Sequence, residues 1–142
     1  TGGQELQIGQ VTDMNEKSVQ TMMSYLSPTR LMSMNKNGFS GSILGKEDVD
    51  GSSSIVVEFK NGEVTETYWF RESDGLLIQR ERPALDGSSV VERLEQYIDF
   101  AGNGMKVAAI RTSIVGGQTM TIRTATVTFN PEFADNAFEL QP

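Results

Sequence analysis

The sequence predicts a mainly β protein with one or two helices, in which a curved antiparallel sheet curls over an N-terminal helix. Three observations predict this class. Turn-forming residues recur about every ten to fourteen positions from Phe39 onward, as in an antiparallel meander. Helical spacing of apolar residues is confined to the stretch before Asn37. Helices and strands do not alternate, which argues against a parallel sheet of βαβ units.

The first predicted element is an amphipathic helix from Asp13 to Leu26. Either Thr12 or Asp13 can act as its N-cap, because both side chains accept a hydrogen bond from a backbone N–H of the first turn. Apolar residues follow at spacings of three and four, which places them on one face of the helix. These residues are Val19, Met22, Met23 and Leu26.

A second, shorter helical turn is predicted after Ser27 and Pro28, since proline suits the first position of a helix. It carries Leu31, Met32 and Met34, and it ends at Asn37 and Gly38.

Strands account for most of the remaining chain. Asn61-Gly62 is the strongest hairpin signal, because both residues tolerate a positive φ. The other predicted connections are Asp50-Gly51, Asp74-Gly75, Pro83–Ser88, Gly102–Gly104 and Gly116-Gly117. The strands between them are Ser42–Asp48, Ser53–Lys60, Glu63–Arg71, Leu76–Arg82, Ser89–Phe100, Met105–Val115 and Gln118–Phe129. From Pro131 to Pro142 we expect irregular chain or a single helical turn.

Alternation within the strands predicts which side chains face the core. In Ser89–Phe100 the apolar residues Val90, Leu94, Ile98 and Phe100 share one side. Ile55, Val57 and Phe59 face together in their strand, as do Val64, Tyr68 and Phe70. Trp69 then points away from Tyr68 and Phe70, so we expect it to be a partly exposed aromatic on the outer face.

Composition excludes several classes of function. The chain has 142 residues, which fits one domain over 1–142, and its net charge of −7 argues against nucleic acid and anionic membrane surfaces as partners. The absence of Cys and His excludes a thiolate nucleophile, a Ser-His-Asp relay and the usual zinc sites. No apolar run approaches the roughly 18 residues of a membrane span. Because the chain starts at Thr1, we expect a mature product or a part of a longer protein.

Charged residues are the remaining candidates for catalytic or binding groups. The carboxylate pairs Glu92/Glu95, Asp48/Asp50 and Glu72/Asp74 lie in polar alternation or in turns, where solvated carboxylates are ordinary. We therefore expect no enzyme, no cofactor and no metal, and a hydrolase remains only a third alternative. Arg80, Arg82 and Arg93 could hold an anionic headgroup, or they could form cross-strand ion pairs with Glu81, Glu92 and Glu95.

Four segments carry a resemblance to a known family. They are "GSILGKEDVDGSSSIVVEF", "TYWFRESDGLLIQRER", "YIDFAGNGMKVAAIRT" and "TVTFNPEFADNAFELQP". In this order and spacing they resemble the C-terminal half of the LolA-like family, the outer-membrane lipoprotein-sorting proteins and their relatives. The chain departs from the family pattern at Ala108, where the family has proline, and strand pairs that precede the first helix in the family are not predicted here.

The resemblance implies a half-barrel, an unclosed antiparallel sheet with helices in its mouth and an apolar concave surface. It implies a non-enzymatic binding or carrier module for a lipid or lipoprotein acyl chain in the bacterial envelope, periplasmic or exported. The expected ligand contacts are Val19, Met22, Met23, Leu26, Leu31, Met32, Met34, Val57, Phe59, Tyr68, Phe70, Leu94 and Ile98.

Two alternatives stay open at this level. The methionines on the helices could form a yielding plug for an acyl chain, or they could be the core face of a helix that covers the sheet. The whole chain could equally be a structural or protein-interaction domain of a larger envelope protein, without a ligand. A homodimer through exposed sheet edges is a further expectation.

Overall fold

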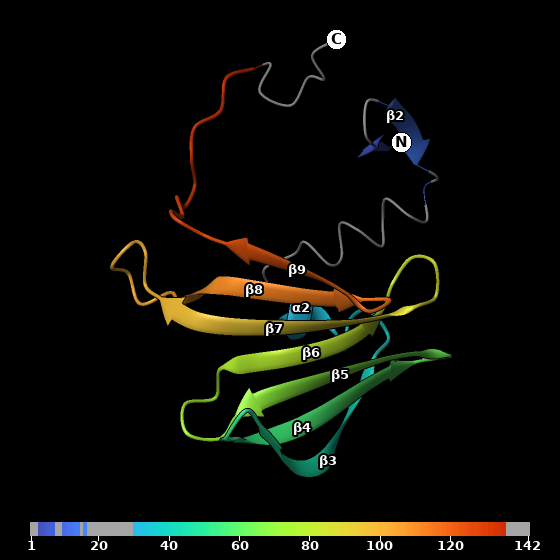
Figure 1. Cartoon of the computed structure of the whole chain (residues 1–142), viewed down its shortest axis with the longest axis vertical. Helices are drawn as coiled ribbons and strands as arrows, with labels where there is room; N and C mark the ends of the chain where they lie inside the picture. Colours follow the sequence, from blue (N-terminus) through green and yellow to red (C-terminus); the bar gives the residue numbers. More distant parts are fainter. Residues whose placement is uncertain (1–2, 8–9, 15, 17–29, 136–142) are drawn as a thin grey trace.

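The computed structural model describes the backbone of residues 3–7, 10–14, 16 and 30–135, and the side chains of residues 16 and 30–135. Two short strands, β1 (Gly3–Gln7) and β2 (Gln10–Met14), form an antiparallel hairpin near the N-terminus. After the short helix α2 (Arg30–Ser33) come the strands of one larger sheet (Figure 1). These are β3 (Ser40–Val49), β4 (Ser52–Asn61), β5 (Val64–Arg71), β6 (Leu77–Pro83), β7 (Ser89–Ile98), β8 (Val107–Val115) and β9 (Gln118–Arg123).

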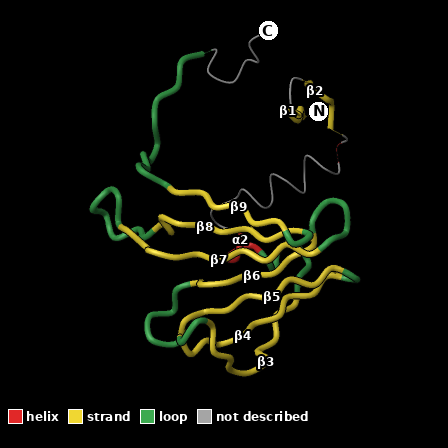
Figure 2. The backbone as a smooth tube through the Cα atoms, in the orientation of Figure 1, coloured by secondary structure: helices red, strands yellow, loops and turns green. Residues whose placement is uncertain are grey.

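The larger sheet is a simple meander in which each strand pairs with the next one along the chain, always antiparallel. It is open, because β3 and β9 lie at opposite edges and do not pair with each other (Figure 2). The hairpin signals explain this order. At the predicted Asn61-Gly62 turn, for example, Gly62 has a φ of 60°. The predictions of a mainly β chain and an antiparallel sheet are confirmed.

The register divides the sheet into two faces. We call the face that carries Tyr68 the inner face, and the face that carries Trp69 the outer face. One row of directly paired residues crosses the inner face from β4 to β9. It consists of Val57, Tyr68, Arg80, Glu92, Ser113 and Met120. Residues of the α2 segment cover the inner face beside β5, where the Met34 side chain is only 1% exposed.

The outer face has its own small apolar cluster of Val56, Trp69 and Ile78, with Val49 packed against it. A bulge in β6, where the pairing shifts between Trp69 and Phe70, brings Ile78 to the Trp69 side. The Trp69 ring is 8% exposed, and its Nε1–H donates a hydrogen bond of 2.8 Å to Glu47 Oε2. The expectation of a partly exposed Trp69 is therefore wrong, because the bulge and β3 supply partners for the ring.

Of the two helical segments predicted near the N-terminus, the structure confirms the second. The second helical turn is confirmed as α2, which is followed by a turn that ends at Gly38, with a φ of 84°. Thr12 and Asp13, the expected N-cap residues of the first helix, lie in β2 instead. Glu16 is helical, and the rest of the predicted helix lies outside the described residues. Among the helices in the described part of the chain, none has the length and apolarity to cross a membrane.

Candidate functional site

A buried ionic cluster joins the α2 segment to the inner face. Arg30 Nη2 donates to Glu66 Oε1, and the hydroxyl of Tyr68 donates to Glu66 Oε2 at 2.7 Å. The Glu66 side chain is fully buried, so these two donors replace the water that its carboxylate loses. Burial, together with the hydrogen bond to Glu66, raises the pKa of Tyr68 to about 12.

A second ionic cluster lies next to the first, because Tyr68 and Arg80 are direct partners across β5 and β6. Arg80 Nε donates to Glu92 Oε2, and Arg82 Nη2 donates to Glu92 Oε1 at 3.3 Å. Burial raises the pKa of Glu92, but the hydrogen bond and charge of Arg80 outweigh it, so this pKa lies below its ordinary value. The prediction of cross-strand ion pairs is confirmed for Arg80 and Arg82, whereas Arg93 pairs with Asp50 in the β3–β4 turn instead of with one of the three predicted glutamates.

Aromatic rings complete the packing beside β5. The rings of Phe59 and Tyr68 meet edge to face at 5.4 Å, and the rings of Tyr68 and Phe70 are stacked at 6.3 Å. Tyr68 and Met34 are both 1% exposed. This half of the inner face is a filled core that joins apolar packing to the two ionic clusters.

The expected ligand contacts divide into four groups. Val57, Phe59, Tyr68 and Phe70 share the inner face beside the buried Met34. Leu94 is buried, and Ile98, two alternations further along β7, is 44% exposed. Met32 is 85% exposed and does not join the packed side chains, whereas Leu31 is half-buried. Val19, Met22, Met23 and Leu26 lie outside the described residues.

The other half of the inner face, on β8 and β9, carries apolar residues that were not among the expected contacts. Met120 pairs with Ser113, and Ile122 pairs with Arg111, so both lie on the inner face. Met120 is 58% exposed and Ile122 is 48% exposed. Together with the exposed Val115 they form what we call the apolar strip. The alternation of Thr119, Met120, Thr121 and Ile122 was the sequence signal for this strip.

Arg111 interrupts the apolar residues of this half. It lies in the row between Leu94 on β7 and Ile122 on β9. Its exposed guanidinium has neither a hydrogen bond nor an ion pair within the described part of the chain. Arg111 is therefore an exposed cation beside the apolar strip, and its charge also helps to lower the pKa of Glu92.

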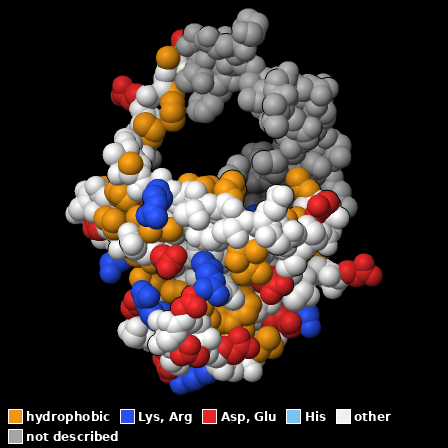
Figure 3. Space-filling view, viewed as in Figure 1, with side chains coloured by type: hydrophobic (Ala, Val, Ile, Leu, Met, Phe, Trp, Pro, Cys, Tyr) orange, Lys and Arg blue, Asp and Glu red, His pale blue; other side chains and the backbone are white. Residues whose placement is uncertain are grey.

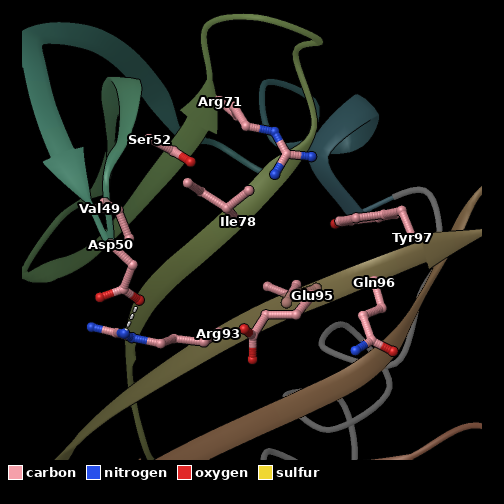
Figure 4. A pocket seen from close by; sticks show the side chains of 10 residues that line it. Val49, Asp50, Ser52, Arg71, Ile78, Arg93, Glu95, Gln96 and Tyr97 are labelled. Atoms are coloured by element: carbon pink, nitrogen blue, oxygen red, sulfur yellow. Dashed lines mark hydrogen bonds and ion pairs between the residues drawn. The ribbon is translucent and has the colours of Figure 1, made fainter.

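The outer face holds a separate pocket of about 270 Å³, between the β3–β4 turn and β7 (Figure 4). Two of its charged side chains have internal partners, because Arg93 pairs with Asp50 and Arg71 pairs with Asp74, whereas Glu95 has no ion-pair partner among the described residues. Asp50 and Gln96 both have a positive φ, of 50° and 52°. Of the expected ligand contacts, Leu94 is the one that lines this pocket. Because both arginines are paired with carboxylates, the pocket offers no unpaired arginine to an anionic ligand.

Among the described residues, charge and metal chemistry indicate no other candidate site. Figure 3 shows acidic and basic side chains interspersed on the face in view, without a large patch of one sign. Within residues 16 and 30–135, no three His, Cys, Asp or Glu side chains gather closely enough to hold a metal ion. The apolar strip and Arg111 are the exposed features of the β8–β9 half of the inner face, while at the opposite edge Ile43, which pairs with Val57, is 74% exposed.

In comparisons with known proteins, no family model, no curated protein and no solved structure matches this chain.

Proposed function

We propose that the protein is a non-enzymatic binding module for an acyl chain or another lipid of the bacterial envelope. The site is the β7–β9 half of the inner face. The observation that carries this proposal is the apolar strip, in which Val115, Met120 and Ile122 stand exposed on one face of two neighbouring strands. Adjacent exposed apolar side chains on a sheet are typical of a surface that binds an apolar partner.

Energetics favour an apolar ligand on this surface. Full burial of a Met, Ile or Val side chain contributes about 1.5–3 kcal/mol, and those of the strip are only partly covered. An acyl chain can cover all three, because they lie on adjacent strands about 4.8 Å apart. Binding would therefore bury apolar surface that the folded chain leaves exposed to water.

Arg111 favours a lipid whose headgroup is an anion. Its guanidinium is exposed beside Ile122, so a carboxylate or phosphate could pair with it while the acyl chain covers the strip. The protein's net charge of −7 opposes long-range attraction of such a lipid, so the affinity must come from these local contacts.

The half-barrel of the LolA-like proteins is the proposed form of the fold, and an envelope location, periplasmic or exported, is the proposed compartment. Two features support this form. The sheet is open at both edges, and the α2 segment packs against one of its faces. In this proposal the ligand lies on the same face as α2, beyond the filled core around Tyr68.

Titration with a fluorescent fatty acid tests the function. Met120→Lys and Ile122→Lys each place a charge in the strip, so each should weaken binding by about tenfold or more. The matched control is Ile114→Lys, because Ile114 is exposed on β8 but belongs to the outer face. Its affinity should stay at the level of the unmodified protein. Absence of saturable binding by the unmodified protein, or equal weakening by Ile114→Lys, would contradict the proposal.

A second candidate function is a structural or protein-interaction domain without a ligand. It is favoured by the inner face beside β5, where Met34, Tyr68 and Glu66 are buried with their partners. This core fills the place where most of the expected ligand contacts among the described residues lie. A protein that folds stably and binds no fatty acid in the titration would support this candidate.

A further inference from the structure

The two edges of the sheet differ in how they are protected. In β3 the pairing with β4 shifts between Ile43 and Gly45, and Lys46 follows at once. A bulge and an edge lysine are both devices that prevent a strand from pairing with another chain. In β9 the pairing with β8 runs without a shift from Gln118 to Arg123, and the strand contains no proline or lysine. Among the described residues, the β9 edge of the larger sheet is therefore the less protected against pairing with a further strand.

The register shows which backbone groups of β9 point outward. Thr124 N–H donates to Ala109 C=O at 2.8 Å, and this pair continues the β8–β9 register. Hydrogen-bonded pairs in an antiparallel ladder recur every second residue, so residues 118, 120 and 122 also point toward β8. The N–H and C=O groups of Thr119, Thr121 and Arg123 must then point away from the sheet. In the described part of the chain, no strand lies on that side of β9.

We propose that β9 pairs with β9 of a second copy of this chain, antiparallel, around a two-fold axis through Thr121 and perpendicular to the sheet. Thr121 then faces Thr121 of the second copy, and Thr119 faces Arg123. Each outward backbone group of one strand meets an outward group of the other. The interface is isologous and closed, so it gives a dimer with one continuous sheet rather than a fibre.

The side chains of β9 match this register. Met120 lies opposite Ile122 of the second copy in a non-hydrogen-bonded pair, where side chains approach most closely. The apolar strips of the two copies therefore meet on the joined inner face. Arg123 lies opposite Thr119 and not opposite a second Arg123, so the pairing avoids a direct contact between like charges.

Neighbouring registers are less favourable. A shift by one residue sets the outward groups of Thr121 against residue 120, whose groups point toward β8. A shift by two residues keeps fewer matched pairs within Gln118–Arg123. The register centred on Thr121 therefore makes the most hydrogen bonds, and its self-complementarity is the reason to name a second copy as the occupant of this edge.

Cysteine cross-linking tests the register, and the chain contributes no cysteine of its own. In Thr121→Cys the two new thiols face each other with Cα atoms about 5.5 Å apart, within disulfide range. In the control Thr119→Cys the two thiols lie four residues apart along the strand, roughly 13 Å, which is out of range. We expect a disulfide-linked dimer from Thr121→Cys at least about tenfold faster than from the control. Equal rates would overturn the proposal.

Sedimentation or light scattering tests the dimer without a cross-link. The unmodified protein should reach twice the 15.6 kDa of one chain as its concentration rises. Thr121→Pro removes one outward N–H and no backbone hydrogen bond to β8, although it also removes the exposed side-chain hydrogen bond of 3.3 Å between the hydroxyls of Thr121 and Thr112. It should remain folded by circular dichroism and sediment as a monomer at the same concentration. It should still bind the fluorescent fatty acid, because the side chains of the apolar strip are unchanged. Failure of the dimer can therefore be distinguished from failure of lipid binding. A monomeric unmodified protein at every concentration would overturn the dimer.

Discussion

The Glu66 side chain is fully buried, so its carboxylate loses its hydration. Arg30 and Tyr68 compensate this loss by donating hydrogen bonds to the carboxylate. In Glu66→Gln the Arg30 guanidinium keeps its charge and its burial but loses its counter-charge. We expect this change to lower the free energy of unfolding by about 3–5 kcal/mol. Urea denaturation measures this loss.

The matched control is Glu95→Gln, since Glu95 is exposed and has no ion-pair partner in the described part of the chain. Its effect should stay within about 0.5 kcal/mol. Equal effects of the two substitutions would mean that the buried cluster does not hold the α2 segment to the sheet.

Tyr68 gives a pH dependence whose sign follows from its pKa. Burial and the hydrogen bond to Glu66 raise this pKa from 10.0 to about 12, so the folded protein retains the phenolic proton more tightly than the unfolded chain. The stabilisation is complete below pH 10 and is lost as the pH rises toward about 12. Ultraviolet titration of tyrosinate should show that Tyr68→Phe removes the component that titrates near pH 12. Removal of a component near pH 10 would contradict the buried hydrogen bond.

At the scale of elements, two methionines in or next to α2 show which side of this segment is buried and which is exposed. Met34 is 1% exposed and Met32 is 85% exposed, although they are two residues apart. We expect Met34→Ala to lower the free energy of unfolding by about 2–5 kcal/mol, because it leaves a cavity under the segment. Met32→Ala should change it by less than about 0.5 kcal/mol. Thermal denaturation compares them, and equal effects would show that the segment does not pack on the sheet as described.

The strands of the meander were predictable because each hairpin is a local signal. Asn61-Gly62 and Asp74-Gly75 mark turns within a few residues of the observed strand ends. The end of β9 was not predictable in this way. Alternation continues to Phe129, but the strand ends at Arg123, near the point where β8 begins at Val107. A strand forms only where a neighbouring strand pairs with it, and local alternation of apolar residues does not indicate where that pairing ends.

Contacts between distant segments explain the other differences from prediction. Arg80, Arg82 and Glu92 lie on neighbouring strands, so alternation was enough to pair them. Arg30 and Glu66 are 36 residues apart in sequence, and no local pattern indicates their contact. Trp69 became buried because a bulge moved Ile78 to its face, and a bulge has no clear signal in this sequence. The apolar strip was predictable in its alternation but not in its exposure.

At the scale of the whole molecule, the inner face has two unlike halves. Beside β5 it is filled by the α2 segment, aromatic rings and paired charges, and on β8 and β9 it exposes the apolar strip. The first half provides the rigid support, and the second provides the surface on which a lipid is proposed to bind. This division assigns stability and binding to different residues, so substitutions in one half should leave the property of the other largely unchanged.

Native mass spectrometry of protein purified from cells without detergent tests the central claim, lipid binding at the apolar strip, most directly. We expect an adduct with the mass of an acyl lipid on the unmodified protein, strongly reduced in Ile122→Lys and retained in Ile114→Lys. The unmodified chain without any lipid adduct, even after incubation with a fatty acid, would contradict lipid binding at the strip.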